Sequence, residues 1–142
     1  METFQFQPIG YVHSPFPDRN SAPKFYTDSG DTTATLEILP EYADGLLGIE
    51  PGMKLLMLFV FNQSTNHSLQ VKKRGTGPVT GVFACRSSRR PNLIGASVID
   101  VIAVDGTTIT FKGVDTLDGT PVLDLKLEKA HYSSEKQPSN QQ

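Results

Sequence analysis

The chain has 142 residues, of which 37% are hydrophobic, and this length is enough for one domain with a real core. Its net charge is −2, and its single cysteine excludes an internal disulfide or a thiolate metal cluster. The acidic amino terminus has no apolar signal core, and the apolar run at 55–61 is too short to cross a bilayer, so we expect a cytoplasmic protein without membrane association.

The first half of the chain predicts three strands and a helix. Alternation of apolar with small or polar residues predicts strands at 9–13 and 33–39, and residues 14–23 between them form an unusually long proline-punctuated loop. A proline and an acidic residue in its first turn predict a short helix at 40–47. The continuous apolar run at 55–61 is typical of a strand covered on both faces.

The second half predicts strands at 79–85, 96–104, 107–111 and 121–125. Asp105-Gly106 predicts a two-residue hairpin turn of type I′, and Asp118-Gly119 predicts another turn. The polar segment 133–142 has nothing to bury, so we expect a disordered tail. We therefore expect an all-β, mainly antiparallel fold over residues 1–132, a small barrel with one or two short helices.

The charges of the middle of the chain are all positive. No acidic residue falls between Glu50 and Asp100. Seven of the 13 basic residues lie there, namely Lys54, Lys72, Lys73, Arg74, Arg86, Arg89 and Arg90. These residues indicate either a functional face for phosphate or carboxylate groups, or a set of unrelated solvated charges.

Several familiar chemistries do not fit the sequence. Gly75–Gly81 is one residue away from a dinucleotide fingerprint but leads into a strand rather than a helix. His13, His67 and His131 are far apart and lack metal-ligand spacing, so we expect no metal site.

The segment 86–92, RSSRRPN, favours an anion-binding site. A guanidinium offers a rigid fork of donors that suits carboxylate or phosphate and stays charged when partly desolvated. Pro91 biases Arg90 toward an extended backbone, and Asn92 offers both a donor and an acceptor. Cys85 lies beside these cations in the sequence, although a small side chain that closes a strand is the more economical role for it.

Two long motifs carry a resemblance to a known family. The first runs from GVFA at 81–84 through Arg86-Ser87 and Arg90-Pro91-Asn92 to Ile94-Gly95; the second is VDTLDGTPVLD at 114–124. On these residues the chain, from about Ile9 to Lys126, resembles the TsaA-like family, also called TrmO. The resemblance implies a homodimeric β-barrel that holds S-adenosylmethionine with loops and methylates threonylcarbamoyladenosine in tRNA.

The resemblance and the arginine segment together nominate the site residues. The expected cofactor-binding residues are Pro23, Lys24, Asn62, Arg86, Ser87, Arg90, Asn92, Leu117, Asp118, Thr120 and Pro121. Asp118 is the candidate catalytic base, and its alternative role is that of a turn aspartate before Gly119. The expected substrate- or RNA-binding residues are Lys72, Lys73, Arg74 and Arg89.

The chain departs from the family pattern at several of these positions. Pro23-Lys24-Phe25 stands where the family usually has Pro-Arg-Gln, Asn62 stands where a histidine is common, and Leu93 replaces a proline. Lys24 keeps the charge but loses the bidentate fork of arginine. These changes leave two alternatives open: a methyltransferase of the same fold for a small molecule, and a non-catalytic ligand- or RNA-binding module.

Overall fold

The computed structural model describes residues 1–18, 32–64, 67–72, 77–113 and 116–128. Its strands are β1 (Gly10–His13), β2 (Thr33–Ile38), β3 (Lys54–Val60), β4 (Gln70–Lys72), β5 (Val79–Gly81), β6 (Ile94–Asp105), β7 (Thr108–Lys112) and β8 (Pro121–Leu127). Two short 3-10 helices, η2 (Pro40–Leu46) and η4 (Val82–Ala84), complete the described elements. No described helix has the length and apolar character that a membrane span requires.

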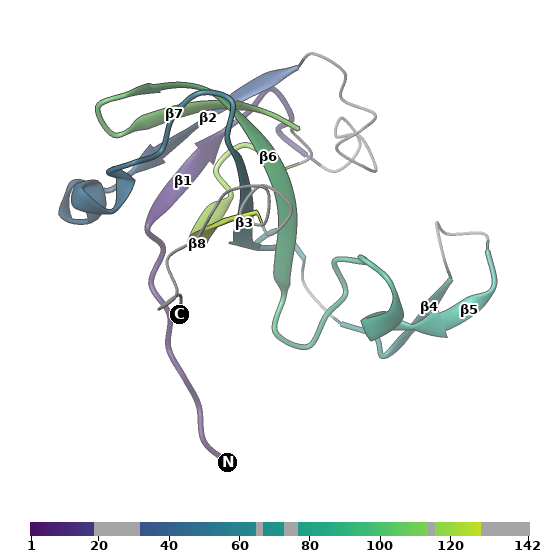
Figure 1. Cartoon of the computed structure of the whole chain (residues 1–142). Helices are drawn as coiled ribbons and strands as arrows, with labels where there is room; N and C mark the ends of the chain where they lie inside the picture. The colour runs from purple at the N-terminus through teal and green to yellow at the C-terminus, as the bar shows by residue number, and fades with distance from the viewer. Residues whose placement is uncertain (19–31, 65–66, 73–76, 114–115, 129–142) are drawn as a thin grey trace, which may run out of the picture.

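Six strands pair in the closed order β1-β2-β7-β6-β3-β8, and β8 pairs back to β1 (Figure 1). Every described strand pair is antiparallel, which confirms the predicted all-β fold. β4 and β5 form a separate two-stranded ribbon that projects away from the barrel (Figure 1). The long segment between β3 and β6 therefore leaves the barrel and returns to it.

The core fills the barrel with alternate side chains from each strand. Its fully buried residues include Val12, Leu36, Met57, Ile99, Ile109, Phe111 and Val122. The expectation that the run at 55–61 is covered on both faces is wrong, because Leu55, Met57 and Phe59 are buried whereas the residues between them are only partly buried. A single closed sheet has one interior, and no strand or helix among the described residues forms a second layer over the outer face of β3.

Three local expectations also change. Asp105 pairs with Thr108, so the hairpin turn is Gly106-Thr107, one residue later than predicted. Of these two residues only Gly106 has a positive φ, 61°, which suits a type II′ turn rather than type I′. The strand expected at 79–85 ends at Gly81 and continues as η4, and the helix expected at 40–47 is a 3-10 helix.

Glu37 fastens this hairpin to β2. Its carboxylate accepts hydrogen bonds from the hydroxyls of Thr107 and Thr108, each at 2.5 Å. These two bonds, in that order, lower the pKa of Glu37 below its ordinary value, since both stabilise the charged form.

Gly10 is required where β1 passes beside β2. A Cβ at Gly10 would lie 2.3 Å from the backbone oxygen of Glu37, whereas a Cβ at Gly45 would meet nothing within 4 Å. We expect Gly10→Ala to lower the free energy of unfolding by about 1–3 kcal/mol, because the obstacle is backbone that cannot rotate away. Urea denaturation measures the change, with Gly45→Ala as the matched control. Equal stability of the two variants would contradict the close approach of β1 and β2.

Candidate functional site

Hydrogen bonds within the arginine segment and its flanking residues hold this loop in shape. The guanidinium of Arg90 donates through Nη1 to the carbonyl oxygens of Cys85, at 2.8 Å, and Ser87, at 3.3 Å. The backbone N–H of Arg89 donates to the Ser87 hydroxyl at 3.1 Å, and that of Leu93 donates to the Arg90 carbonyl at 3.2 Å. These bonds fix the loop before any ligand arrives, so binding would carry a smaller ordering cost.

The positive charge of this loop is not neutralised by the described part of the chain. Arg86 donates to the carbonyl of Ala96, and the ion pairs among the described residues involve other side chains. Arg86 and Arg89 are exposed and Arg90 is half-buried, with described hydrogen bonds from Nη1 alone. The loop therefore presents guanidinium donors to an outside anion.

Asp118 lies in a turn that is tied to the end of β1. The backbone N–H of Thr120 donates to the Leu117 carbonyl at 3.1 Å, and Gly119 has the positive φ, 83°, that the predicted turn needs. The Asp118 carboxylate accepts the backbone N–H of Ser14 through Oδ1 at 3.1 Å and lies 3.8 Å from His13 Nδ1. Its side chain is 52% exposed, so the same carboxylate braces a loop and remains open to a ligand.

The other residues of this turn have mainly internal contacts. Thr120 is only 4% exposed and donates its hydroxyl to the Leu117 carbonyl at 2.6 Å, so its side chain holds the turn rather than facing solvent. Pro121 pairs with Tyr11 at the closure of the barrel. The Thr116 hydroxyl is buried and has no hydrogen-bond partner among the described residues.

Three contacts link the arginine segment to the Asp118 turn indirectly, through the residues after β3 and the loop after β1, at one end of the barrel. The backbone N–H of Phe61 donates to the Leu93 carbonyl at 2.8 Å, which links the end of β3 to the start of β6. Gln63 Nε2 donates to the Pro17 carbonyl at 3.4 Å, and the Asp118 N–H donates to the Phe16 carbonyl at 2.8 Å. Segments that are more than 100 residues apart in the sequence, such as those of Phe16 and Asp118, therefore lie at the same end of the barrel.

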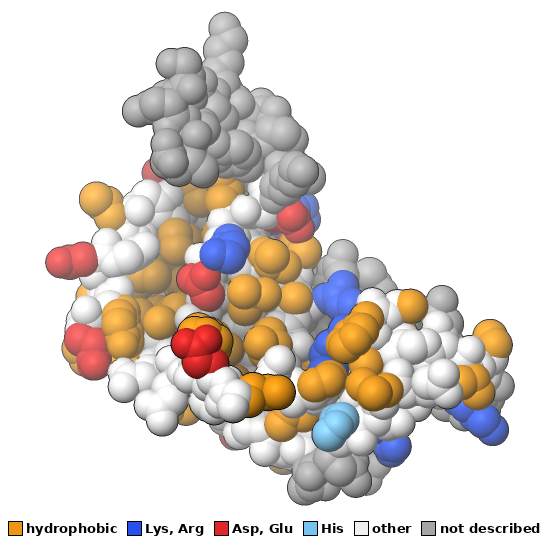
Figure 2. All heavy atoms as spheres, turned by 90° about the horizontal axis from the view of Figure 1, so that it is seen from below, with side chains coloured by type: hydrophobic (Ala, Val, Ile, Leu, Met, Phe, Trp, Pro, Cys, Tyr) orange, Lys and Arg blue, Asp and Glu red, His pale blue; other side chains and the backbone are white. Residues whose placement is uncertain are grey.

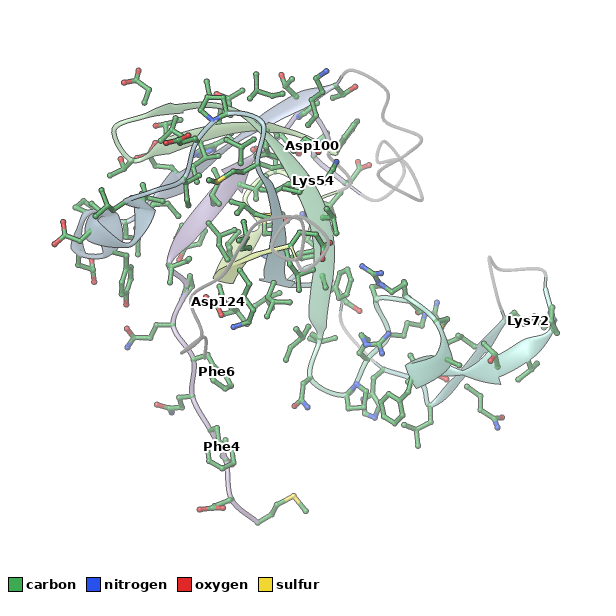
Figure 3. All side chains as sticks on the ribbon, in the orientation of Figure 1. Phe4, Phe6, Lys54, Lys72, Asp100 and Asp124 are labelled. Carbon is green, nitrogen blue, oxygen red and sulfur yellow. The ribbon has the colours of Figure 1, made fainter. Side chains whose placement is uncertain are left out.

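Most expected site residues fall at this end, and a few do not. Asn62 and Asn92 are exposed there, directly after β3 and before β6. Lys72 lies on the projecting ribbon, away from the barrel (Figure 3). The candidates Pro23, Lys24, Lys73 and Arg74 lie outside the described residues. Cys85 is a free, half-buried thiol 3.5 Å from the Val82 carbonyl, which suits a packing role.

An apolar groove of about 620 Å³ lies at the opposite end of the barrel, between η2 and β8. Its lining includes Tyr42, Leu46, Ile49, Met53, Leu125 and Leu127, with Glu41, Asp44 and Asp124 among its polar residues. Its described lining contains no arginine, and its lysine, Lys126, pairs with Asp124 at 2.8 Å. The remaining carboxylates, Glu41 and Asp44, would repel an anionic group. We therefore place the candidate site at the arginine end.

Sequence reasoning missed two neighbours of Asp118. His13 and Ser14 meet the Asp118 carboxylate, and the Ser14 hydroxyl also donates to the Thr116 carbonyl at 2.8 Å. The motif Ser14-Pro15-Phe16 was visible in the sequence, but its partner, about 100 residues away, was not.

A closed antiparallel barrel with an arginine loop and a carboxylate turn at one end defines a small β-barrel domain whose candidate site is built from loops. The family model described as the tRNA-methyltransferase O N-terminal domain matches residues 11–132, and the chain belongs to this family. The match spans both motifs, and the resemblance seen in the sequence is confirmed.

Similar proteins include binding proteins and enzymes. An S-adenosyl-L-methionine-binding protein of Archaeoglobus fulgidus is 38% identical over 120 residues, which are 84% of this chain and 86% of that protein. A mouse tRNA (adenine(37)-N6)-methyltransferase is 36% identical over 137 residues, 90% of this chain and 31% of the enzyme. The crystal structure of TrmO from Pseudomonas aeruginosa matches with a TM-score of 0.76 at 33% identity.

The chain spans only part of several of these relatives. It covers 62% of the Pseudomonas aeruginosa TrmO chain, against 98% of its own length. It covers 66% of a probable S-adenosyl-L-methionine-binding protein of Pyrococcus abyssi, to which it is 36% identical over 121 residues, 85% of this chain.

Leu93 has a backbone conformation that a proline cannot adopt. Its φ is 56°, and its N–H donates to the Arg90 carbonyl. Proline fixes φ near −65° and removes the donor, so we expect Leu93→Pro to lower the free energy of unfolding by about 2–3 kcal/mol. Leu93→Gly should stay within about 1 kcal/mol of the parent, since glycine tolerates positive φ. Thermal unfolding of both variants measures the difference; a Leu93→Pro protein as stable as the parent would contradict the left-handed conformation.

Proposed function

We propose that this chain is an S-adenosylmethionine-dependent methyltransferase domain that acts, in the cytoplasm, on N6 of a threonylcarbamoyl-modified adenosine in tRNA. The observation that carries the proposal is the meeting of the arginine loop and the Asp118 turn at one barrel end. Membership of the tRNA-methyltransferase O family supports it, as does similarity to the S-adenosyl-L-methionine-binding protein of Archaeoglobus fulgidus and to the mouse tRNA (adenine(37)-N6)-methyltransferase.

The donor set at this end suits the cofactor. When bound, S-adenosylmethionine supplies an electrophilic methyl group on a positively charged sulfur, and it also carries a carboxylate and an adenine edge. Arg86 and Arg90 would hold the carboxylate, since guanidinium groups pair with carboxylates through two parallel bonds. Asn92, exposed beside them, offers the donor and acceptor that an adenine edge needs. Leu117 and Thr120 would act through the shape of the turn.

Asp118 would take the proton that the acceptor nitrogen loses. Its Oδ1 accepts the Ser14 N–H, so the carboxylate is oriented by the end of β1 rather than by its own flexible side chain. Its half-exposed position lets it reach an outside nitrogen. A positioned general base typically contributes about 10²- to 10⁴-fold in rate, and positioning of the acceptor supplies much of the remainder.

Methyl transfer tests this proposal directly. Purified protein is incubated with methyl-labelled S-adenosylmethionine and with tRNA that either carries or lacks the threonylcarbamoyl group. We expect label only in the modified tRNA. Asp118→Asn should lower the rate by about 10²- to 10⁴-fold with unchanged cofactor affinity, because the amide oxygen can still accept the Ser14 N–H.

The control is Asp105→Asn, an exposed aspartate at the hairpin of the opposite barrel end, which should retain the full rate. Full activity of Asp118→Asn would show that Asp118 is not the base and has only a structural role in its turn. Label in a small-molecule acceptor but not in tRNA would contradict the tRNA assignment, and cofactor binding without any transfer would favour a non-catalytic module.

We also propose that the chain works as a homodimer. Phe4 and Phe6 lie on an extended segment before β1 and are 71% and 72% exposed (Figure 3). A second copy could cover them, and burial of one phenylalanine side chain contributes about 1.5–3 kcal/mol.

Sedimentation equilibrium should show a dimer that the double variant Phe4→Ser/Phe6→Ser weakens roughly tenfold or more. Leu47→Ser, at a residue that is 94% exposed on the barrel, is the control; a monomeric parent would contradict the proposal.

A further inference from the structure

The side chain of Phe83 is exposed to solvent next to Val82, whose side chain is buried. In η4, Val82 is 1% exposed and anchors the turn, whereas Phe83 is 77% exposed. A single exposed hydrophobic residue needs no explanation. Phe83, however, belongs to the motif that leads into the arginine segment, and the proposed methyl transfer gives it no role.

The backbone holds Phe83 close to Arg89. The carbonyl of Leu69 accepts the N–H of Val82 at 2.9 Å, and the N–H of Ser68 donates to the carbonyl of Arg89 at 3.1 Å. Two consecutive residues, Ser68 and Leu69, thus connect the segment that carries Phe83 to the segment that carries Arg89 through backbone hydrogen bonds. The exposed ring and the exposed guanidinium therefore arise from neighbouring backbone.

The connection between them is also fixed. The Arg90 guanidinium bridges the carbonyls of Cys85 and Ser87, and the Ser87 hydroxyl accepts the Arg89 N–H. Phe83 and Arg89 thus lie on a braced loop, not on independent flexible segments. A braced loop that carries both an exposed ring and an exposed cation is a pre-formed arrangement of the kind that a recognition surface requires.

The charge around Phe83 selects the kind of partner. No acidic residue occurs between Glu50 and Asp100, and the exposed cations Lys72, Arg86 and Arg89 belong to this stretch. Figure 2 shows hydrophobic side chains beside Lys and Arg on the part of the molecule that projects from the barrel. An aromatic face among uncompensated cations fits a nucleobase flanked by phosphates better than an apolar protein surface.

We infer that Phe83 is a stacking platform for an unpaired base of an RNA substrate, with Arg89 and Lys72 on the adjoining phosphates. The inference rests on the proposed function for the choice of RNA as partner. Stacking on an aromatic side chain is sequence-tolerant, because every base has a π-face, so Phe83 would position RNA rather than read its sequence.

The chain contains no tryptophan, so Phe83→Trp introduces its only indole fluorophore. The probes are an RNA hairpin with an unpaired loop and a fully paired duplex of the same base composition. We expect the hairpin, and not the duplex, to quench the fluorescence of Phe83→Trp. The control Leu47→Trp places an indole at a position that is even more exposed, on the groove at the opposite end, and should be quenched by neither RNA.

Affinity gives a second measurement. Phe83→Ala should weaken hairpin binding roughly 5- to 150-fold, and Phe83→Trp should restore it. Arg89→Ala should weaken binding to hairpin and duplex alike and flatten the dependence of affinity on salt, as the loss of a phosphate contact requires.

Unchanged hairpin affinity in Phe83→Ala, or equal quenching by both RNAs, would overturn the inference. So would a Phe83→Ala variant whose only defect is weaker self-association, because Phe83 would then be covered by a second copy. The inference and the proposed function can fail separately. If the parent transfers methyl groups and Phe83→Ala binds the hairpin as tightly as the parent does, only the stacking role is contradicted. If the hairpin alone quenches Phe83→Trp but the parent transfers no methyl group, stacking is supported and the proposed function is contradicted.

Discussion

Closure of the barrel between β1 and β8 is the constraint on which the rest of the structure depends. Only two residue pairs, Gly10 with Val122 and Tyr11 with Pro121, join these strands. β1 fits between its neighbours because Gly10 has no Cβ to strike the Glu37 carbonyl. Closure places the loop after β1 against the turn before β8, and so orients the Asp118 carboxylate.

Closure also makes the two ends of the barrel chemically different. One end receives the arginine segment and the Asp118 turn, and the other receives η2 and an apolar groove with carboxylates among its lining. Arg90 donates to carbonyls of its own loop, and Arg86 donates to the carbonyl of Ala96 on β6. Neither has a described carboxylate partner, so the loop is braced yet still cationic. Rigidity and uncompensated positive charge are the properties that a loop-built anion site needs, and here the loop carries both on the scaffold of the barrel.

Local features were predictable from the sequence, whereas contacts between residues far apart in the chain were not. Alternation located the barrel strands, and Gly119 marked its turn, because both depend on neighbouring residues. The run at 55–61 was misjudged, since apolar residues on the outer face of β3 reflect partial exposure, not a second layer. The segment 79–85 was also misjudged, since the alternation of residues does not distinguish a strand that ends at Gly81 from one that continues. The tie of Asp118 to Ser14 depends on barrel closure, and that of Phe61 to Leu93 depends on the pairing of β3 with β6. No local pattern encodes either.

The central claim is that residues from both motifs form one cofactor site at the arginine end. The most direct measurement is a titration of isotopically labelled protein with S-adenosylmethionine, followed by backbone amide NMR shifts. The account predicts that amides of residues 86–93 and 117–120 shift together along one binding curve, while those of 41–49 in the groove stay unchanged. Shifts confined to the groove at the opposite end, or to one motif alone, would contradict it.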